Sequence, residues 1–160
     1  MSDKVNHILK PISPDYVGAY LNTGIQLYDL IEWTLRQTGK ASVTVMTFSL
    51  SEEFIRKIFL LKRAGLIERI TVLLDFKAIQ KTQKLVRFAG NVFDDIVYAK
   101  THAKIVLIDS ATHKVAISGS QNATRGNREE SGIVTTIADT YLQFETEIKR
   151  IKEISIRNGV

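Results

Sequence analysis

The chain has 160 residues, of which 44% are hydrophobic and 24% charged, a composition typical of a soluble globular domain. It contains no cysteine, which excludes disulfides, thiolate metal sites and a cysteine nucleophile, and its net charge of +5 allows an anionic partner. Because the N-terminus lacks an unbroken apolar segment and no run approaches the roughly 18 apolar residues of a membrane helix, we expect a cytoplasmic protein that does not enter a membrane.

Apolar periodicity and turn residues divide the rest of the chain into helices and strands. Residues 1–14 carry both prolines of the sequence and show no clear period, which indicates an N-terminal arm. In chain order we then expect a helix over 15–38, a strand over 42–50, a helix over 52–65, a strand over 69–75, a helix over 76–90, strands over 95–99, 103–109, 114–118 and 131–137, and a helix over 138–155.

This order predicts an α/β fold with a mixed β-sheet flanked by helices on both faces. The early strands alternate with helices and should be parallel, whereas the turn "SATH" joins residues 103–109 to 114–118 as a hairpin. No internal repeat and no linker is visible, so we expect residues 1–160 to form a single domain.

The stretch "KTHAKIVLIDSATHKVAISGSQN" carries most of the polar side chains that could do chemistry. His102 and Lys104 are two residues apart on an expected strand, so both should point to the same face. Asp109 should face the other way unless the turn redirects it, while Ser120 and Asn122 repeat the spacing of two. Lysine, serine and asparagine would form an anion site in which the histidine attacks or protonates, although a solvated edge strand could carry the same pair of residues.

The residues "HAKIVLID" and "GSQNATRGNREESGIV" together resemble the phospholipase D superfamily, whose signature is H-x-K-x-x-x-x-D, then G-S-x-N, then a glutamate before a strand. His102, Lys104 and Asp109 match the first part of the signature. Gly119, Ser120 and Asn122 match the second part. Glu130 matches the later glutamate, with Glu129 as the fallback.

The resemblance extends over residues 42–137, because the predicted strand, helix and strand over 42–75 are similar to the lead-in of the family. The first 40 residues carry no motif that we can place. Nine residues, Ser110 to Ser118, separate Asp109 from Gly119, where the family has six. We expect the longer turn to leave the site intact, with Asp109 in a structural role.

The resemblance implies a phospholipase D-like fold and a phosphodiesterase that needs no metal and no cofactor. In this family two copies of the motif form one site, and this chain holds one, which implies a homodimer with the active site at its interface, similar to the family's short bacterial endonucleases. One His102 would form a phosphohistidine while the second protonates the leaving oxygen. Lys104, Asn122 and Ser120 would hold the phosphate, and Glu130 would orient an imidazole.

Basic residues near this motif indicate a polyanionic substrate. Lys77, Lys81, Lys84 and Arg87 are spaced to share one helix face, and Arg125 and Arg128 flank the motif. The same spacing is also typical of a solvated amphipathic helix. We therefore expect a nuclease that hydrolyses DNA or RNA, with a phospholipase or phosphatidyl transferase and a nucleic-acid-binding module with little turnover as the alternatives.

Overall fold

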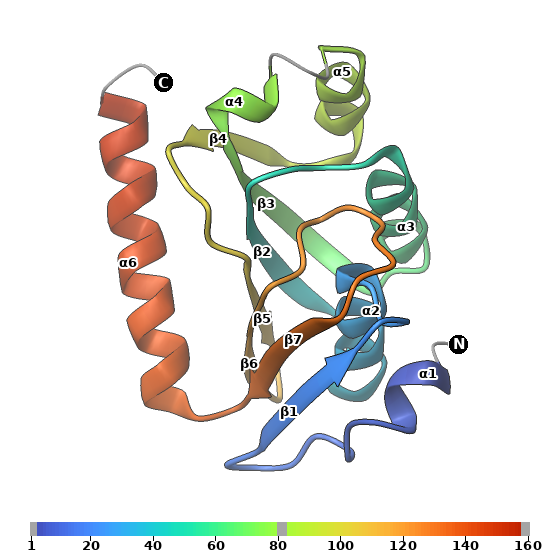
Figure 1. Cartoon of the computed structure of the whole chain (residues 1–160). Helices are drawn as coiled ribbons and strands as arrows, with labels where there is room; N and C mark the ends of the chain where they lie inside the picture. Colours follow the sequence, from blue (N-terminus) through green and yellow to red (C-terminus); the bar gives the residue numbers. More distant parts are fainter. Residues whose placement is uncertain (1–2, 80–82, 158–160) are drawn as a thin grey trace.

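The computed structural model describes residues 3–79 and 83–157, which form a mixed sheet with the strand order β1-β7-β6-β5-β2-β3-β4 (Figure 1). The strands are β1 (Val17–Asn22), β2 (Ala41–Thr47), β3 (Ile67–Asp75), β4 (Asp95–Ala99), β5 (Ile105–Ser110), β6 (Lys114–Gly119) and β7 (Glu130–Thr135). The helices are α1 (Asp3–Asn6), α2 (Leu27–Thr38), α3 (Glu52–Arg63), α4 (Phe76–Ile79), α5 (Gln83–Val92) and α6 (Ala138–Arg157).

The direction of each strand follows from the connection that precedes it. β2, β3 and β4 are parallel. After β2, helix α3 returns the chain to the end of the sheet at which β2 began, and α4 and α5 do the same after β3. β5 and β6 form an antiparallel hairpin, and β5 also runs antiparallel to β2. These pairings confirm the mixed sheet and the early parallel strands that the sequence predicts.

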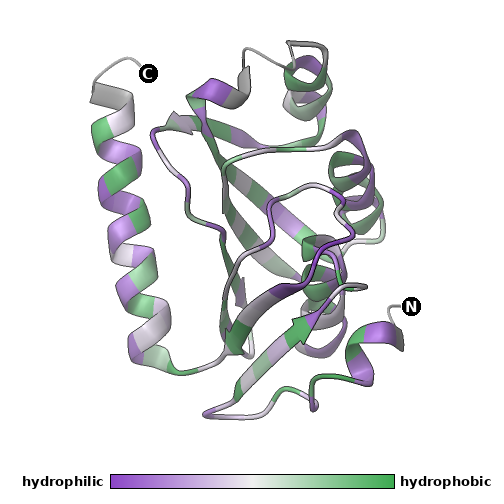
Figure 2. Cartoon of the chain, in the orientation of Figure 1, coloured by the Kyte–Doolittle hydropathy of each residue, from purple (hydrophilic) through white to green (hydrophobic). Residues whose placement is uncertain are grey.

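Helices cover both faces of the sheet, as the continuous buried runs in β3, β5 and β6 require. Val43, Val45 and Ile70 belong to the core that α1, α2, α3 and α5 share with one face. On the other face, residues such as Met46 and Leu73 pack against α6 (Figure 1). Hydrophobic and hydrophilic turns alternate along α6 (Figure 2), which is the pattern of a helix with one side against the sheet and the other in solvent.

The predicted helix over 15–38 is wrong in its first half. Val17–Asn22 is a strand at the edge of the sheet, and the helix begins only at Leu27. The backbone N–H of Gln26 donates to the Asp29 carboxylate at 2.9 Å, which starts α2 at this point. β1 pairs with β7, more than a hundred residues later in the chain, so local periodicity could not reveal it.

The helix predicted over 76–90 is also divided differently in the structure. Phe76–Ile79 and Gln83–Val92 are described as two helices, and residues 80–82 between them lie outside the described residues. Gly90 does not end the second helix, which continues to Val92. Within the part of the chain that the structure covers, none of the helices is both long and apolar enough to cross a membrane.

Candidate active site

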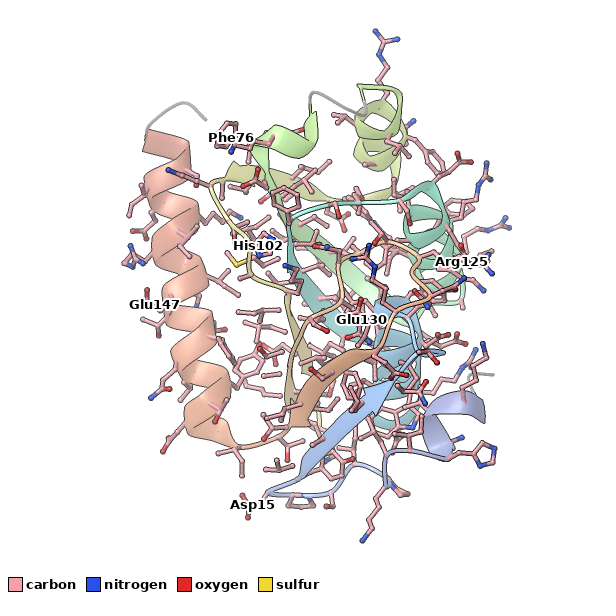
Figure 3. All side chains as sticks on the ribbon, viewed as in Figure 1. Asp15, Phe76, His102, Arg125, Glu130 and Glu147 are labelled. Atoms are coloured by element: carbon pink, nitrogen blue, oxygen red, sulfur yellow. The ribbon has the colours of Figure 1, made fainter. Side chains whose placement is uncertain are left out.

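Apart from Asp109, the residues of the polar motif lie on loops and strand termini at one end of the sheet. Residues 100–104 connect β4 to β5 and carry the histidine and the lysine, whereas residues 120–129 connect β6 to β7. Lys104 was expected within the strand over 103–109, but β5 begins only at Ile105. Figure 3 shows the labelled side chains of His102 and Glu130 in the same region, with Arg125 farther along the loop between β6 and β7.

His102 lies between an aromatic ring and an ammonium group. The rings of Phe48 and His102 have centroids 5.1 Å apart and planes inclined by 50°. The Nζ of Lys104 lies 3.0 Å from the Nδ1 of His102 and donates to its backbone oxygen at 2.7 Å. The imidazole is therefore in contact with a ring just after the end of β2 and with an ammonium group from its own loop.

Lys104 also experiences the charge of Glu130, the first residue of β7. Partial burial lowers the pKa of Lys104 below its ordinary value, and the negative charge of Glu130 opposes this shift. The backbone N–H of Gly119 donates to the carbonyl of Lys104 at 3.2 Å, which joins the two halves of the motif.

Ser120 and Glu130 form a connected pair at the start of β7. The hydroxyl of Ser120 donates to the Glu130 carboxylate, while the N–H of Ser131 donates to the Ser120 Oγ at 3.0 Å. Glu129, the fallback, is exposed and makes none of these contacts among the described residues. Glu130 is thus the glutamate that the fold brings to the site, although no hydrogen bond joins it to His102 within the described part of one chain.

Asn122 lies on a loop that is attached to the end of β2. The N–H of Ala123 donates to the Thr47 Oγ1 at 3.0 Å, and the N–H of Ser51 donates to the carbonyl of Ala123 at 2.9 Å. The side-chain oxygen of Asn122 is buried without a donor among the described residues. The described residues therefore leave part of the hydrogen-bonding capacity of this side chain unused.

Asp75 holds the histidine segment in place, and the sequence analysis did not select it. Its carboxylate is 4% exposed and accepts hydrogen bonds from the N–H of Lys77 and the N–H of Thr101, each at 2.9 Å. Thr101 in turn accepts a bond from the N–H of Ala103 through its Oγ1 at 3.1 Å. The signal that could have found it is an acidic residue directly after the buried strand "ITVLL".

Solved structures with the same fold were found, although no protein-family model and no curated protein matches the chain. NucT from Helicobacter pylori aligns with a TM-score of 0.64 and 16% identity over 86% of this chain and 97% of NucT. Polyphosphate kinase from Porphyromonas gingivalis aligns with a TM-score of 0.64 and 16% identity over 90% of this chain. Phosphatidylserine synthase from Haemophilus influenzae Rd KW20 aligns with a TM-score of 0.58 and 16% identity over 85% of this chain.

All three proteins are members of the phospholipase D superfamily. The chain has the phospholipase D fold. It spans nearly all of NucT but only 29% of the polyphosphate kinase and 38% of the phosphatidylserine synthase. The resemblance stated from the motif is therefore confirmed for the fold.

Asp109 is the motif residue that this phospholipase D fold does not bring to the others. We call those others, His102, Lys104, Ser120, Asn122 and Glu130, the cluster. It lies near the far end of β5, where it pairs with Ser42 on one side and Lys114 on the other. Its carboxylate is 3.4 Å from the Nζ of Lys114, and both side chains are nearly half exposed. These contacts are those of a residue that supports the hairpin, which agrees with the structural role expected for it.

The same hairpin explains the nine residues between Asp109 and Gly119. They are the last residue of β5, a three-residue turn and most of β6, and the pairing from Ile105↔Ser118 to Asp109↔Lys114 has no shift in register. A regular hairpin of this length returns Gly119 to a position beside Lys104. The extra residues lengthen the strand pair at the end away from the site.

The basic residues expected to bind substrate are distributed over three segments. Lys77 lies on α4 and Arg87 on α5, and both are exposed. Lys81 and the side chain of Lys84 fall outside the described residues. Arg125 lies 3.6 Å from the Glu53 carboxylate, and Arg128 is exposed on the same loop.

Proposed function

We propose that this protein is a metal-independent phosphodiesterase, a nuclease that hydrolyses DNA or RNA through a phosphohistidine intermediate at a homodimer interface. The observation that carries the proposal is the convergence of His102 and Lys104 with Ser120 and Glu130, which are far apart in sequence, at one end of a phospholipase D fold. A titratable nucleophile, a cation and hydroxyl or amide donors are the groups that phosphoryl transfer requires.

The reaction has two steps, and both histidines of the dimer take part. A ring nitrogen of His102 attacks phosphorus, the bond from phosphorus to the leaving oxygen breaks, and the partner's His102 gives that oxygen a proton. The partner's His102 then removes a proton from water. The resulting hydroxide attacks phosphorus, breaks the P–N bond and restores the first imidazole, so that one water is consumed for each phosphodiester cleaved.

The other residues of the cluster stabilise negative charge on the phosphate and keep the reacting groups in position. We assign Lys104 to the negative charge that develops on the non-bridging oxygens, and Asn122 supplies an amide whose Oδ1 has no partner among the described residues. Glu130 supports the cationic form of Lys104 and holds the Ser120 hydroxyl. In the dimer, we assign to Glu130 the further role of orienting an imidazole.

A nucleic-acid backbone is the substrate that best fits the charge around the cluster. Arg128 is exposed and Arg125 is mostly exposed on the loop that follows Asn122, while Lys77 is exposed two residues after Asp75. Cations in such positions interact with repeated phosphates and not with a single headgroup. The likeness to NucT, a phospholipase D-like nuclease, supports the same choice.

An exposed apolar surface near the cluster could pack against a second copy of the chain. Val17 is 61% exposed, Leu21 69% and Ile133 47%, and the pairing of β1 with β7 places these three side chains on one face. Leu21 pairs with Ser131, which is bonded to Ser120. A twofold axis near this end of the sheet would cover the apolar face and bring two copies of His102 together.

The test is incubation with plasmid, single-stranded DNA, RNA and phosphatidylcholine vesicles in EDTA. We expect nucleic-acid cleavage that persists in EDTA and falls by about a thousandfold or more in His102→Ala. The control is His113→Ala, because His113 lies in the turn at the opposite end of the hairpin. Cleavage that EDTA abolishes, or that survives in His102→Ala, would contradict the mechanism.

Two other outcomes would replace the nuclease assignment. Hydrolysis of phosphatidylcholine alone would identify a phospholipase. Salt-dependent binding of nucleic acid without cleavage would identify a binding module.

A further inference from the structure

The residue between Ser120 and Asn122 is anchored in the interior. Gln121 is 4% exposed, and its Oε1 accepts a hydrogen bond from the hydroxyl of Tyr20. Its Nε2 donates to the carbonyl of Ile25 at 3.2 Å. Both ends of the Gln121 amide are therefore bonded to the N-terminal segment, in which the sequence shows no motif.

The hydroxyl of Tyr20 lies close to the backbone of two glycines, one on β6 and one on β7. A Cβ at Gly132 would lie 2.4 Å from the Tyr20 hydroxyl, and a Cβ at Gly119 would lie 2.8 Å from it. Any side chain at these two paired positions would displace the tyrosine. The glycine of the G-S-x-N motif thus leaves space for a residue from the edge strand β1.

The contact has a direct geometric consequence for the cluster. Ser120 is exposed and is bonded to Glu130, and Asn122 is half-buried, whereas Gln121 between them points inward. Holding the middle residue inward prevents rotation of the segment, so its two neighbours keep their orientation toward the site. Preorganisation of this kind lowers the reorganisation required during catalysis.

We propose that Tyr20 and Gln121 are positioning residues that hold Ser120 and Asn122 in the orientation needed to bind the phosphate; the inference rests on the proposed function. Burial raises the pKa of Tyr20 to about 12 despite the lowering effect of the Gln121 bond, and the negative charge of Glu130 makes a smaller contribution in the same direction as burial. The tyrosine therefore remains a hydrogen-bond donor throughout the range in which an enzyme of this kind would work.

The test compares two tyrosine variants on the same N-terminal segment. Tyr20→Phe removes the hydroxyl that bonds Gln121, whereas Tyr16→Phe removes a buried hydroxyl that has no partner among the described residues. We expect Tyr20→Phe to lower kcat by about tenfold to a hundredfold with KM changed by less than about twofold, and Tyr16→Phe to leave both unchanged.

A second variant tests the same pair from the other side. Gln121→Leu removes the bond to Tyr20 and the bond to Ile25, so it should lower kcat at least as much as Tyr20→Phe, and the double variant Tyr20→Phe/Gln121→Leu should lose no more than Gln121→Leu alone. Additive losses, or a lowered thermal midpoint with normal kcat, would overturn the proposal, since a merely structural contact would give that result.

Amide hydrogen exchange separates a failure of this inference from a failure of the proposed function. We expect faster exchange at residues 120–123 in Tyr20→Phe than in wild type or Tyr16→Phe, whether or not a substrate is cleaved. If the wild type cleaves none of the substrates, the proposed function is wrong and this measurement alone decides the positioning role. Unchanged exchange at these residues would overturn it.

Discussion

Lys104 interacts with residues from both halves of the motif, with His102 in the first and with Gly119 and Glu130 in the second. Its ammonium contacts the ring of His102, its carbonyl accepts from Gly119, and its pKa responds to Glu130. Burial lowers this pKa, and the carboxylate partly offsets the effect. Glu130 therefore helps Lys104 to stay charged at a pH where a half-buried lysine alone would lose its proton more readily.

The variant Glu130→Gln should move the alkaline limb of the pH–rate profile to lower pH. Removing a negative charge that raises the pKa of Lys104 lowers that pKa, so the cationic form disappears earlier as pH rises. The measurement is kcat/KM from pH 7 upward, normalised to the maximum of each variant. Glu129→Gln is the matched control, and a limb that stays in place or moves upward in Glu130→Gln would argue against this role.

Among the elements, the ends of β2 and β3 position the loops of the site. Thr47 at the end of β2 binds the loop of Asn122, and Asp75 at the end of β3 binds the segment that precedes His102. Except for Glu130 at the start of β7, the site residues lie on connections, while Thr47 and Asp75, which hold them, belong to strands of the sheet. This division is typical of sites in which loops supply the chemistry and the sheet supplies the precision.

The variant Asp75→Asn should lower kcat about tenfold and the free energy of unfolding by about 1–3 kcal/mol. The carboxylate accepts from two backbone N–H groups through two different oxygens, and an NH₂ group in place of one oxygen cannot accept. Kinetics and urea unfolding measure the two effects. Glu68→Gln, an exposed position on the same strand, is the control, and a normal kcat in Asp75→Asn would show that the segment keeps its position without this anchor.

At the scale of the whole molecule, the single copy of the motif and the exposed apolar face of β1 and β7 both favour a dimer. Val17, Leu21 and Ile133 have no cover among the described residues, although they lie at the same end of the sheet order as the Ser120–Glu130 pair. If the partner's His102 completes the site, activity depends on the fraction of dimers in which both subunits carry His102. It does not depend simply on the fraction of chains that carry it.

Mixed dimers of wild type and His102→Ala test this dependence. After subunit exchange in an equal mixture, about one quarter of the dimers contain two intact histidines, so about one quarter of the activity should remain. A site complete within each chain would retain about half. Mixing with His113→Ala should leave full activity, and sedimentation velocity on the same samples reports the oligomeric state.

Local sequence patterns predicted the elements in which apolar residues form a continuous run or repeat with helical spacing. β2, α3 and β3 follow from β-branched runs, from the Ser51 cap and from an apolar helix face. β1 was missed because its burial depends on pairing with β7, and Val17 and Leu21 point to solvent while Tyr20 is buried. A hydrophobic pattern of this mixed kind has no signature within a single window of sequence.

The candidate site was predicted in the same uneven way. His102, Lys104, Ser120, Asn122 and Glu130 were selected because their order and spacing match a motif. Asp75, Phe48, Tyr20 and Gln121 were not, because each acts through a contact with a residue far away in sequence. The motif consists of the groups that we propose to contact a substrate, whereas the groups that hold them can be supplied from any neighbouring strand.

By itself, the sequence determined the fold class, the parallel and hairpin connections and the residues of the motif, since these depend on periodicity and spacing along the chain. Only the tertiary structure decided that β1 forms one edge of the sheet, that Glu130 and not Glu129 accepts a hydrogen bond from Ser120, and that Asp109 lies away from His102. The physical reason is that side-chain spacing is a local property of the backbone, whereas register and burial depend on which distant strands pair.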